Sequence, residues 1–281
     1  MQLEQCSRVS LCSSTSRKEQ DLSPTTSPSP SPANVVIRLP GEIDGVVDQD
    51  QEWCEVEVDG LSRRLRFHDY AEIYTIPSAY EKLFYDELQC SSPGVVRDLL
   101  ERALVNTGYD ASSLRVIDVG AGNGLVGAEM RALGASSVVG ADIIPEAAEA
   151  ALRDRPEVYD DYLVVDLTDL SDADRERMTK HEFNCLTCVA ALGFGDMPPE
   201  AFLEAVRYVS PSGWLAFCIK DRFLGDEDES GFARLVRQLM DSGTLEVLER
   251  QRYIHRLDMR GRPLYYEAVV ARRAPGSEHI L

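Results

Sequence analysis

The fold class is decided by the stretch Leu114-Arg-Val-Ile-Asp-Val-Gly-Ala-Gly-Asn-Gly124, near the middle of the chain. Its first half, Leu114 to Val119, is a short apolar run rich in β-branched residues, which predicts a buried strand. Three glycines follow at alternate positions, and a glycine backbone can approach a ligand closely and adopt positive φ angles. A helix is predicted directly afterwards, over residues 125–133, and Gly134 marks its end. The stretch therefore predicts one βα unit of an α/β fold.

Strands and helices continue to alternate after this unit. Helices that begin at Pro145 and Pro199, and one with an apolar stripe from Phe232 to Leu239, separate further strand-like runs. Such alternation predicts a mostly parallel sheet that is doubly wound, with helices on both faces. The connection between the last two strands is too short for a crossover helix, so they should be antiparallel neighbours. We expect seven strands, over residues 114–119, 137–141, 162–165, 183–192, 214–219, 244–257 and 264–271.

The chain before the sheet divides into two parts by composition. Residues 1–50 begin with a Ser/Pro-rich segment that cannot bury much apolar surface, so we expect a disordered tail and linker there. Residues 51–110 combine a hairpin over 53–67, with Asp59-Gly60 as its turn, and an aromatic, helix-like segment. This part should form a hairpin and a helical lid. Residues 111–281 then hold the α/β domain.

Acidic residues recur at the predicted strand ends. Asp118, Asp142 and Asp166 follow one another at equal intervals, each at the end of a predicted strand. Ligands of open α/β sheets bind beyond the carboxyl ends of the strands. A single acid there is most often a helix cap or a solvated turn. Three acids beside a glycine loop instead indicate a site for a ligand with a cationic amine, a ribose and an adenine.

The residues from Asp118 to Gly124 resemble the glycine motif of class I S-adenosylmethionine-dependent methyltransferases, a Rossmann-like family. The resemblance covers roughly Phe67 to Arg273 and includes Pro211-Ser-Gly-Trp214, which is similar to the family's turn into the fifth strand. It implies S-adenosylmethionine as the cofactor and methyl transfer as the activity. It also implies that the N-terminal helices cover the cofactor as a lid.

The resemblance implies roles for individual residues. The glycine loop would pack against the methionyl part of the cofactor, Asp142 would hold the ribose hydroxyls, and Asp166 would read the adenine. From the predicted lid, Tyr74 and Tyr80 are expected to contact the cofactor or the substrate, because a phenol offers an apolar face and a hydrogen bond. The residues expected to bind the cofactor are Asp118, Gly120, Gly122, Asn123, Gly124, Asp142, Ile143, Asp166, Leu167, Val189, Tyr74 and Tyr80.

Two other functions compete with this interpretation. Gly122 to Gly127 satisfies G-x-G-x-x-G, with an acid downstream at Asp142, as in NAD(P)-dependent oxidoreductases. The predicted strand ends near Val119, however, so the loop begins at Gly120, and in that register Leu125 replaces the third glycine. The other alternative is a non-catalytic module that binds S-adenosylmethionine. We would expect it to lose the glycine loop or the acids, and this chain keeps both.

Methyl transfer needs few catalytic groups, since a sulfonium methyl is already electrophilic and the protein mainly aligns the two reactants. A base helps where the acceptor is a weakly acidic hydroxyl or an ammonium group. His68 and His255 are the candidate catalytic residues, and Lys220 is a further candidate base. His255 could equally pair with Asp258 or serve the core. The His and Cys residues lack the spacing of a zinc site, so no metal is expected.

Composition narrows the choice of partners. The 281 residues contain 48 Asp and Glu but only 29 Lys and Arg, a net charge of −19, without a dense basic block. Nucleic acid is therefore not expected as a partner. No apolar run is long enough for a membrane span, and seven scattered cysteines favour a reducing, cytoplasmic setting. We expect a small-molecule acceptor, methylated on oxygen or nitrogen. The acceptor's identity and the oligomeric state cannot be derived from the sequence.

Overall fold

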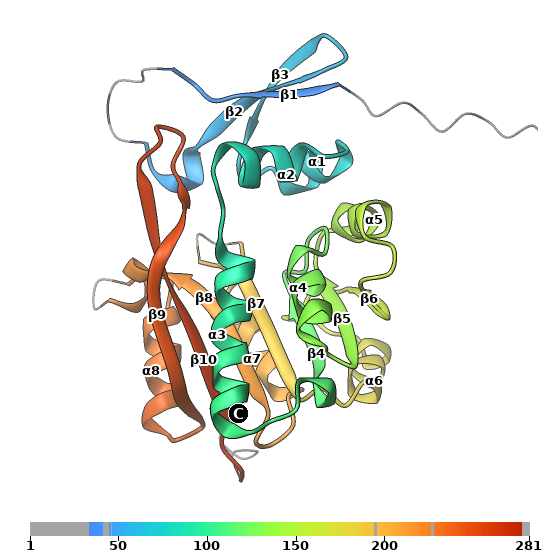
Figure 1. Cartoon of the computed structure of the whole chain (residues 1–281), viewed down its shortest axis with the longest axis vertical. Coiled ribbons are helices and arrows are strands. Elements are labelled where there is room, and N and C mark those ends of the chain that lie inside the picture. The colour runs from blue at the N-terminus through green and yellow to red at the C-terminus, as the bar shows by residue number, and fades with distance from the viewer. Residues whose placement is uncertain (1–33, 42–44, 46, 194–195, 226–227, 277–281) are drawn as a thin grey trace, which may run out of the picture. The chain divides into compact units, whose positions relative to one another are not determined.

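The computed structural model of the protein describes residues 34–41, 45, 47–193, 196–225 and 228–276. Its main sheet has seven strands in the order β6-β5-β4-β7-β8-β10-β9. Strands β4 to β8 run parallel and β10 is antiparallel to β9, both as predicted, and β10 also pairs antiparallel with β8 (Figure 1). The strands are β4 (Arg115–Val119), β5 (Ser137–Asp142), β6 (Asp161–Val164), β7 (Cys185–Leu192), β8 (Trp214–Lys220), β9 (Leu245–Leu257) and β10 (Pro263–Arg273).

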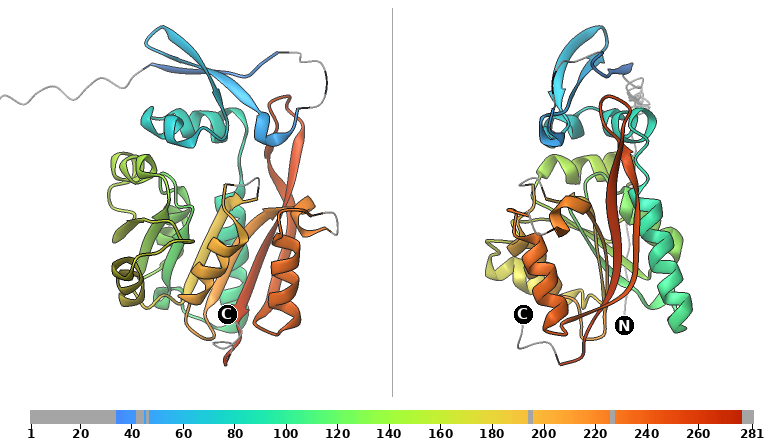
Figure 2. Two further views of the ribbon diagram at one scale, coloured as in Figure 1. Left: turned by 180° about the vertical axis from the view of Figure 1, so that it is seen from behind. Right: turned by 90° about the vertical axis from the view of Figure 1, so that its left-hand side faces the viewer.

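Helices cover both faces of this sheet (Figure 2). One core lies between the sheet and α3 and α4, and the other lies between the sheet and α6, α7 and α8. In the latter core Phe202 of α7 meets Phe217 of β8 edge to face, with ring centroids 5.3 Å apart. Such a pair adds about 0.5–1.5 kcal/mol to the burial of its two rings. The helices are α3 (Ser92–Thr107), α4 (Leu125–Leu133), α5 (Pro145–Asp154), α6 (Asp172–Lys180), α7 (Pro199–Arg207) and α8 (Phe232–Asp241).

A small cap precedes α3. Its strands β1 (Val35–Arg38), β2 (Trp53–Val58) and β3 (Leu61–Arg66) form an antiparallel sheet, and Asp59 and Gly60 make the expected turn with positive φ angles. The helical part follows as α1 (Tyr70–Thr75), α2 (Ala79–Glu81) and a π-helical segment, η2 (Lys82–Glu87). Three short 3₁₀ helices complete the described elements: η1 (Gln49–Gln51), η3 (Ala111–Ser113) and η4 (Asp221–Leu224).

Two features of the fold differ from the sequence-based expectations. Residues 1–50 were expected to form a tail and linker, but Val35–Arg38 form β1, because their alternating apolar side chains pack on β2 within the cap core. The Ser/Pro-rich residues 1–33 lie outside the described residues. Helix α6 was not predicted, because its residues are almost all polar. A capping box between Ser171 and Asp174 starts it, and only Met178 is buried.

Candidate functional site

The site begins where the strand order reverses. β4 lies between β5 and β7, so the chain leaves β4 toward one side of the sheet and later returns to the other. Ligands of doubly wound sheets bind at such a switch point, beyond the carboxyl ends of the strands. The glycine loop after β4 lies at this position, and the helices of the cap lie beyond the same strand ends (Figure 1).

The glycine loop requires its glycines. Gly120, Gly122 and Gly124 all have positive φ angles, of 68°, 52° and 90°. A Cβ atom at Gly120 would lie 2.6 Å from the Cβ of Ala191, and one at Gly122 would lie 2.4 Å from the hydroxyl of Tyr74. The Tyr162 hydroxyl donates a hydrogen bond to the carbonyl of Gly122 at 2.8 Å, and this bond helps to fix the loop. Larger residues would displace β7 or the cap.

Two of the predicted acids lie beside this loop. Asp142, at the end of β5, accepts hydrogen bonds from the amides of Gly122 and Ile144, both at 3.0 Å. Burial raises its pKa above the usual range, although these bonds oppose the shift. Asp166, beyond β6, accepts from the amide of Thr168 at 2.8 Å, and the bonds to Thr168 hold its pKa below the usual range. Both acids line the same cavity.

The side chain of Asp118 does not line this cavity. It pairs in register with Thr187 of β7, and its carboxylate accepts from the Thr187 hydroxyl at 2.8 Å and from the Tyr159 hydroxyl at 2.7 Å. Burial raises the pKa of Asp118 to about 7. The expectation that Asp118 stands at the same rim as the other two acids is wrong, because its side chain is engaged inside the sheet. Gly124 likewise caps α4 and lies outside the lining of both cavities described below.

Two cavities meet at the glycine loop. The first, here called the acid cavity, has a volume of about 130 Å³ and is lined by Asp142, Ile143, Asp166, Leu167, Met197 and Pro198, among others. The second, the cap cavity, has about 60 Å³ and is lined by Phe67, His68, Phe84, Tyr85, Gly122, Asn123, His255, Arg256 and Tyr266, among others. The residues that line both are Tyr70, Tyr74, Tyr80, Gly120, Val189, Ala190, Ala191 and Asp196. These shared residues lie between the two cavities and border both of them.

Three tyrosines of the cap are among the residues that border both cavities. The rings of Tyr70 and Tyr74 stack with centroids 6.3 Å apart, and those of Tyr74 and Tyr80 stack at 5.0 Å. Tyr74 packs on Ala147 and Ala150 of α5. The guanidinium of Arg153 donates to the Tyr74 carbonyl at 2.9 Å, so α5 also holds the backbone of α1. Tyr74 and Tyr80, which were expected to contact the cofactor or the substrate, both line the acid cavity and the cap cavity.

The two candidate histidines have different surroundings. Nδ1 of His68 lies 2.7 Å from Oδ2 of Asp196, a residue that the sequence did not single out. His255 is 4% exposed, with Nδ1 2.6 Å from the Ser92 hydroxyl and its ring 4.0 Å from that of Tyr266. Burial, together with the charges of Arg256 and Lys220, lowers the pKa of His255 well below its usual range. These contacts favour a structural role for His255 over proton transfer, and its partner is Ser92 rather than Asp258.

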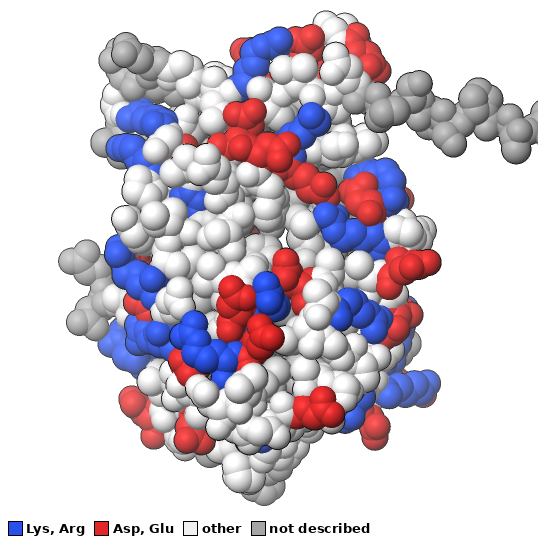
Figure 3. Space-filling view, viewed as in Figure 1, with Lys and Arg blue, Asp and Glu red and all other residues white. Residues whose placement is uncertain are grey.

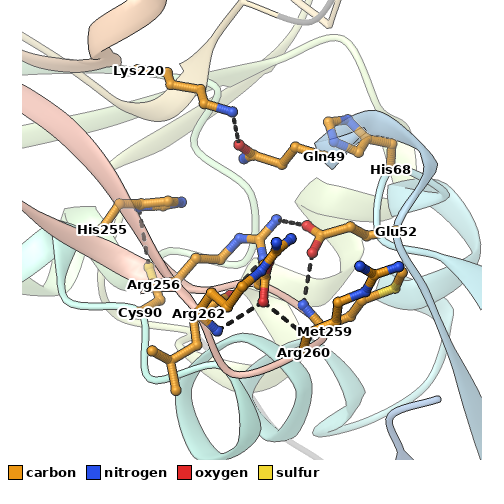
Figure 4. A network of polar contacts seen from close by, with 12 residues as sticks. Gln49, Glu52, His68, Cys90, Lys220, His255, Arg256, Met259, Arg260 and Arg262 are labelled. Carbon is orange, nitrogen blue, oxygen red and sulfur yellow. Dashed lines mark hydrogen bonds and ion pairs between the residues drawn. The ribbon is translucent and has the colours of Figure 1, made fainter. Parts of the chain in front are cut away.

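A polar network lies beside the cap cavity (Figure 4), and three of its residues, Gln49, Arg256 and Tyr266, line that cavity. Glu52 and Arg256 form an ion pair at 2.6 Å, and each side chain is only 3% exposed. Nζ of Lys220 donates to Gln49 at 2.7 Å, and Gln49 donates to the Tyr266 hydroxyl at 3.0 Å. Burial lowers the pKa of Lys220 to about 8, with help from neighbouring arginines. The network connects the cap to β8, β9 and β10.

The surface and the remaining polar residues add three observations. On the face shown in Figure 3, Lys and Arg side chains are interspersed with Asp and Glu rather than gathered in a basic stripe. Within the described part of the chain, no three His, Cys, Asp or Glu residues form a group that could hold a metal ion. None of the helices among the described residues has the length and apolar character that crossing a membrane requires.

Comparisons with known proteins agree with this geometry. A family model described as a methyltransferase domain matches residues 90–269. The ubiquinone biosynthesis O-methyltransferase of Thiobacillus denitrificans is 30% identical over 118 residues, which are 42% of this chain and 49% of that protein. The chain thus matches about half the length of this curated relative.

Solved structures of methyltransferases can be superposed on this chain, and the fold is shared with the first of the two described here. The N-methyltransferase NodS from Bradyrhizobium japonicum, in complex with S-adenosyl-L-homocysteine, superposes with a TM-score of 0.50 at 13% identity, covering 74% of this chain and 97% of that one. Magnesium protoporphyrin IX methyltransferase from Synechocystis, with bound S-adenosylmethionine, gives 0.45 at 18% identity, covering 65% of this chain and 79% of that one.

Proposed function

This chain belongs to the methyltransferase domain family and uses S-adenosylmethionine as its cofactor, and we propose that it methylates an oxygen or nitrogen atom of a small molecule. The observation that carries the proposal is the pair of adjacent cavities. One has carboxylates suited to a nucleoside, and the other is enclosed by the cap. Eight residues line both, so the two cavities are direct neighbours, as a cofactor site and an acceptor site would have to be.

The residues of the acid cavity fit the cofactor. Asp142 lies at the cavity wall, where its carboxylate would accept hydrogen bonds from the ribose hydroxyls. Asp166 and Leu167, with Ile143, would surround the adenine. The positive φ angles of Gly120 and Gly122, and the close neighbours of both, leave room only for a backbone against the methionyl part. Val189, which lines both cavities, and Asn123, which lines the cap cavity, would complete the site where the methionyl part reaches the cap cavity. Asp118 would support the loop from inside the sheet.

When bound, S-adenosylmethionine supplies a methyl group on a positively charged sulfur. The chain's own residues would align the acceptor with that methyl group and exclude water from it. Tyr70, Tyr74 and Tyr80 line both cavities, so they are placed to do both. We propose that residues 51–110 act as a lid on the domain formed by residues 111–281. Lids of this kind commonly complete an active site when they close.

The acceptor should be a small molecule. The cap cavity is narrow and enclosed by buried aromatic residues, and a protein segment or nucleic acid strand would need a more open groove. An acidic chain with interspersed charges also disfavours nucleic acid. A cytoplasmic location remains part of the proposal, on the evidence of its cysteine usage.

Incubation of the protein with methyl-labelled S-adenosylmethionine and a metabolite extract, followed by mass spectrometry, tests the proposed function. We expect the label in a compound of low molecular mass, and no transfer by a variant in which Asp142 is replaced by alanine. Label found only in protein or nucleic acid would contradict the small-molecule proposal.

A further inference from the structure

We propose that His68 and Asp196 together accept the proton of an aromatic hydroxyl group, with His68 as the general base and Asp196 as its positioning residue. The proposal rests on the proposed function, since it names the acceptor class and the base of the same site. It starts from the 2.7 Å contact between Nδ1 of His68 and Oδ2 of Asp196. The two residues are far apart in the sequence, so only the fold brings them together.

The pair stands where the two cavities meet. Asp196 follows the carboxyl end of β7, a central strand of the main sheet, and lines both cavities. His68 comes from the cap, between β3 and α1, and lines the cap cavity. An acceptor in the cap cavity that faces the cofactor must present its reacting atom at this junction. A base at the junction is therefore within reach of the proton that the acceptor loses.

The contact also selects the tautomer of the imidazole. A carboxylate accepts hydrogen bonds, so Nδ1 of a neutral His68 carries the hydrogen and Nε2 carries the lone pair. The Tyr70 ring meets the His68 ring edge to face, with centroids 5.5 Å apart, and further restricts its orientation. The His68 side chain is 12% exposed and that of Asp196 is 33% exposed. Besides Asp196, the neighbouring Asp69 on the same segment interacts electrostatically with His68.

The wall of the cap cavity indicates an aromatic acceptor. Aromatic rings from several elements line it: Phe67, Tyr70, Phe84, Tyr85 and Tyr266. Among the described residues that line it, the Lys, Arg, Asp and Glu side chains are only Asp196 and Arg256, and Arg256 is neutralised by Glu52. A flat, uncharged ring packs well in such surroundings, whereas a phosphate or a second carboxylate would find no unneutralised arginine or lysine there.

The proposed step balances without a further reactant. The O–H bond of the acceptor breaks and its proton passes to Nε2 of His68. The oxygen forms a bond to the methyl carbon while the carbon–sulfur bond breaks, and the electron pair of that bond remains on sulfur. Asp196 then stabilises the imidazolium, as carboxylates do in other Asp–His pairs. His68 returns the proton to water when the products leave.

Two phenols that differ in acidity test the role of His68. Phenol itself is protonated near pH 8, whereas much of 4-nitrophenol is already ionised there and needs no base. We expect H68Q to lower kcat/KM for phenol by about 100-fold or more and for 4-nitrophenol by less than about tenfold. H181Q is the matched control, because His181 also contacts an aspartate, Asp161 at 3.1 Å, but lies outside both cavities.

The role of Asp196 as a positioning residue is tested by two measurements that a purely structural role would leave unchanged. D196N should move the rising limb of the pH profile for phenol to lower pH, because an amide stabilises an imidazolium less than a carboxylate does. Nitrogen NMR of the His68 ring, recorded with S-adenosylhomocysteine and no acceptor, should show the Nδ1–H form in the wild type and a mixture of tautomers in D196N.

Three results would overturn the proposal: equal losses for both phenols in H68Q, an unchanged pH profile in D196N, or no methylation of either phenol by the wild type. The proposed function fails in a different way. It fails if the metabolite extract yields no labelled small molecule, whereas the His68 proposal can fail while that labelling and S-adenosylmethionine binding both remain.

Discussion

The hydroxyl of Tyr74 lies directly over Gly122, so close that a Cβ atom at position 122 would stand 2.4 Å from it. Tyr74 belongs to α1 of the cap and Gly122 to the loop after β4, so this contact joins the cap to the cofactor loop. Gly122 also donates its amide hydrogen to Asp142 at 3.0 Å. The position of the tyrosine, the shape of the loop and the orientation of the acid therefore depend on one another.

Replacing Gly122 by alanine should disturb the position of Tyr74, the shape of the glycine loop and the orientation of Asp142. Alanine is strained at a φ of 52°, and its methyl group would push Tyr74 away. We expect G122A to weaken S-adenosylmethionine binding more than about tenfold, or about 1.4 kcal/mol. G261A is the matched control, because Gly261 has a φ of 76° but nothing within 4 Å of its added Cβ. Calorimetry should show normal binding for G261A, and equal losses in both variants would mean that backbone strain alone matters.

The buried ion pair between Glu52 and Arg256 should contribute to the attachment of the cap. Removing one partner leaves the other charge buried, which typically costs about 3–5 kcal/mol. We expect E52Q to lose stability of this order in urea denaturation. E57Q removes the exposed pair between Arg38 and Glu57, whose side chains are 52% and 27% exposed, and should change stability by less than about 1 kcal/mol. Similar effects in both variants would show that the buried pair has no special role.

The raised pKa of Asp118 predicts that the free energy of unfolding depends on pH. Its carboxyl group has a pKa of about 7 in the folded protein, against 3.8 as the ordinary value. The folded state therefore binds more protons than the unfolded state between these two pH values, and stability falls as the pH rises through this window. D118N cannot ionise, so the wild type should lose on the order of 4 kcal/mol relative to D118N between about pH 4 and about pH 8.

Urea denaturation at several pH values would measure this difference. D110N serves as the control, because a bond to Ser112 holds the pKa of Asp110 below its usual range. Asp110 is therefore ionised across the same window. The difference in unfolding free energy between D110N and the wild type should stay constant there. A constant gap for D118N as well would contradict the raised pKa of Asp118.

Cofactor binding should order the aromatic segment of the cap. Hydrogen exchange of the amides in residues 70–85 should slow when S-adenosylmethionine is added, because Tyr70, Tyr74 and Tyr80 of this segment line both cavities. The amides of α8, on the far side of the sheet from α4, should not change. Tyr74 is only 6% exposed, so Y74F is a better test than alanine and should reduce the protection with little loss of stability. Unchanged exchange in 70–85 would mean that the segment is only structural packing.

The local features of the site could be predicted from the sequence. Each depends on a short pattern: the glycines after an apolar run, Asp142 and Asp166 at strand ends, and the tyrosines before α3. What could not be predicted depends on residues far away in the chain. Asp118 turns into the sheet because Thr187 and Tyr159 meet it there. Asp196 joins His68 across 128 positions, and no motif around either residue signals the contact.

The most direct test of the cofactor site is calorimetric titration of S-adenosylmethionine into the wild type, D142A and D169A. Asp169 is an exposed acid near the same sheet edge that lines neither cavity, so D169A is the control. We expect micromolar binding, about −8 kcal/mol, by the wild type and D169A, at least tenfold weaker binding by D142A, and no binding of NAD. Equal affinity in all three proteins, or binding of NAD in place of S-adenosylmethionine, would contradict the assignment of Asp142 and the acid cavity to this cofactor.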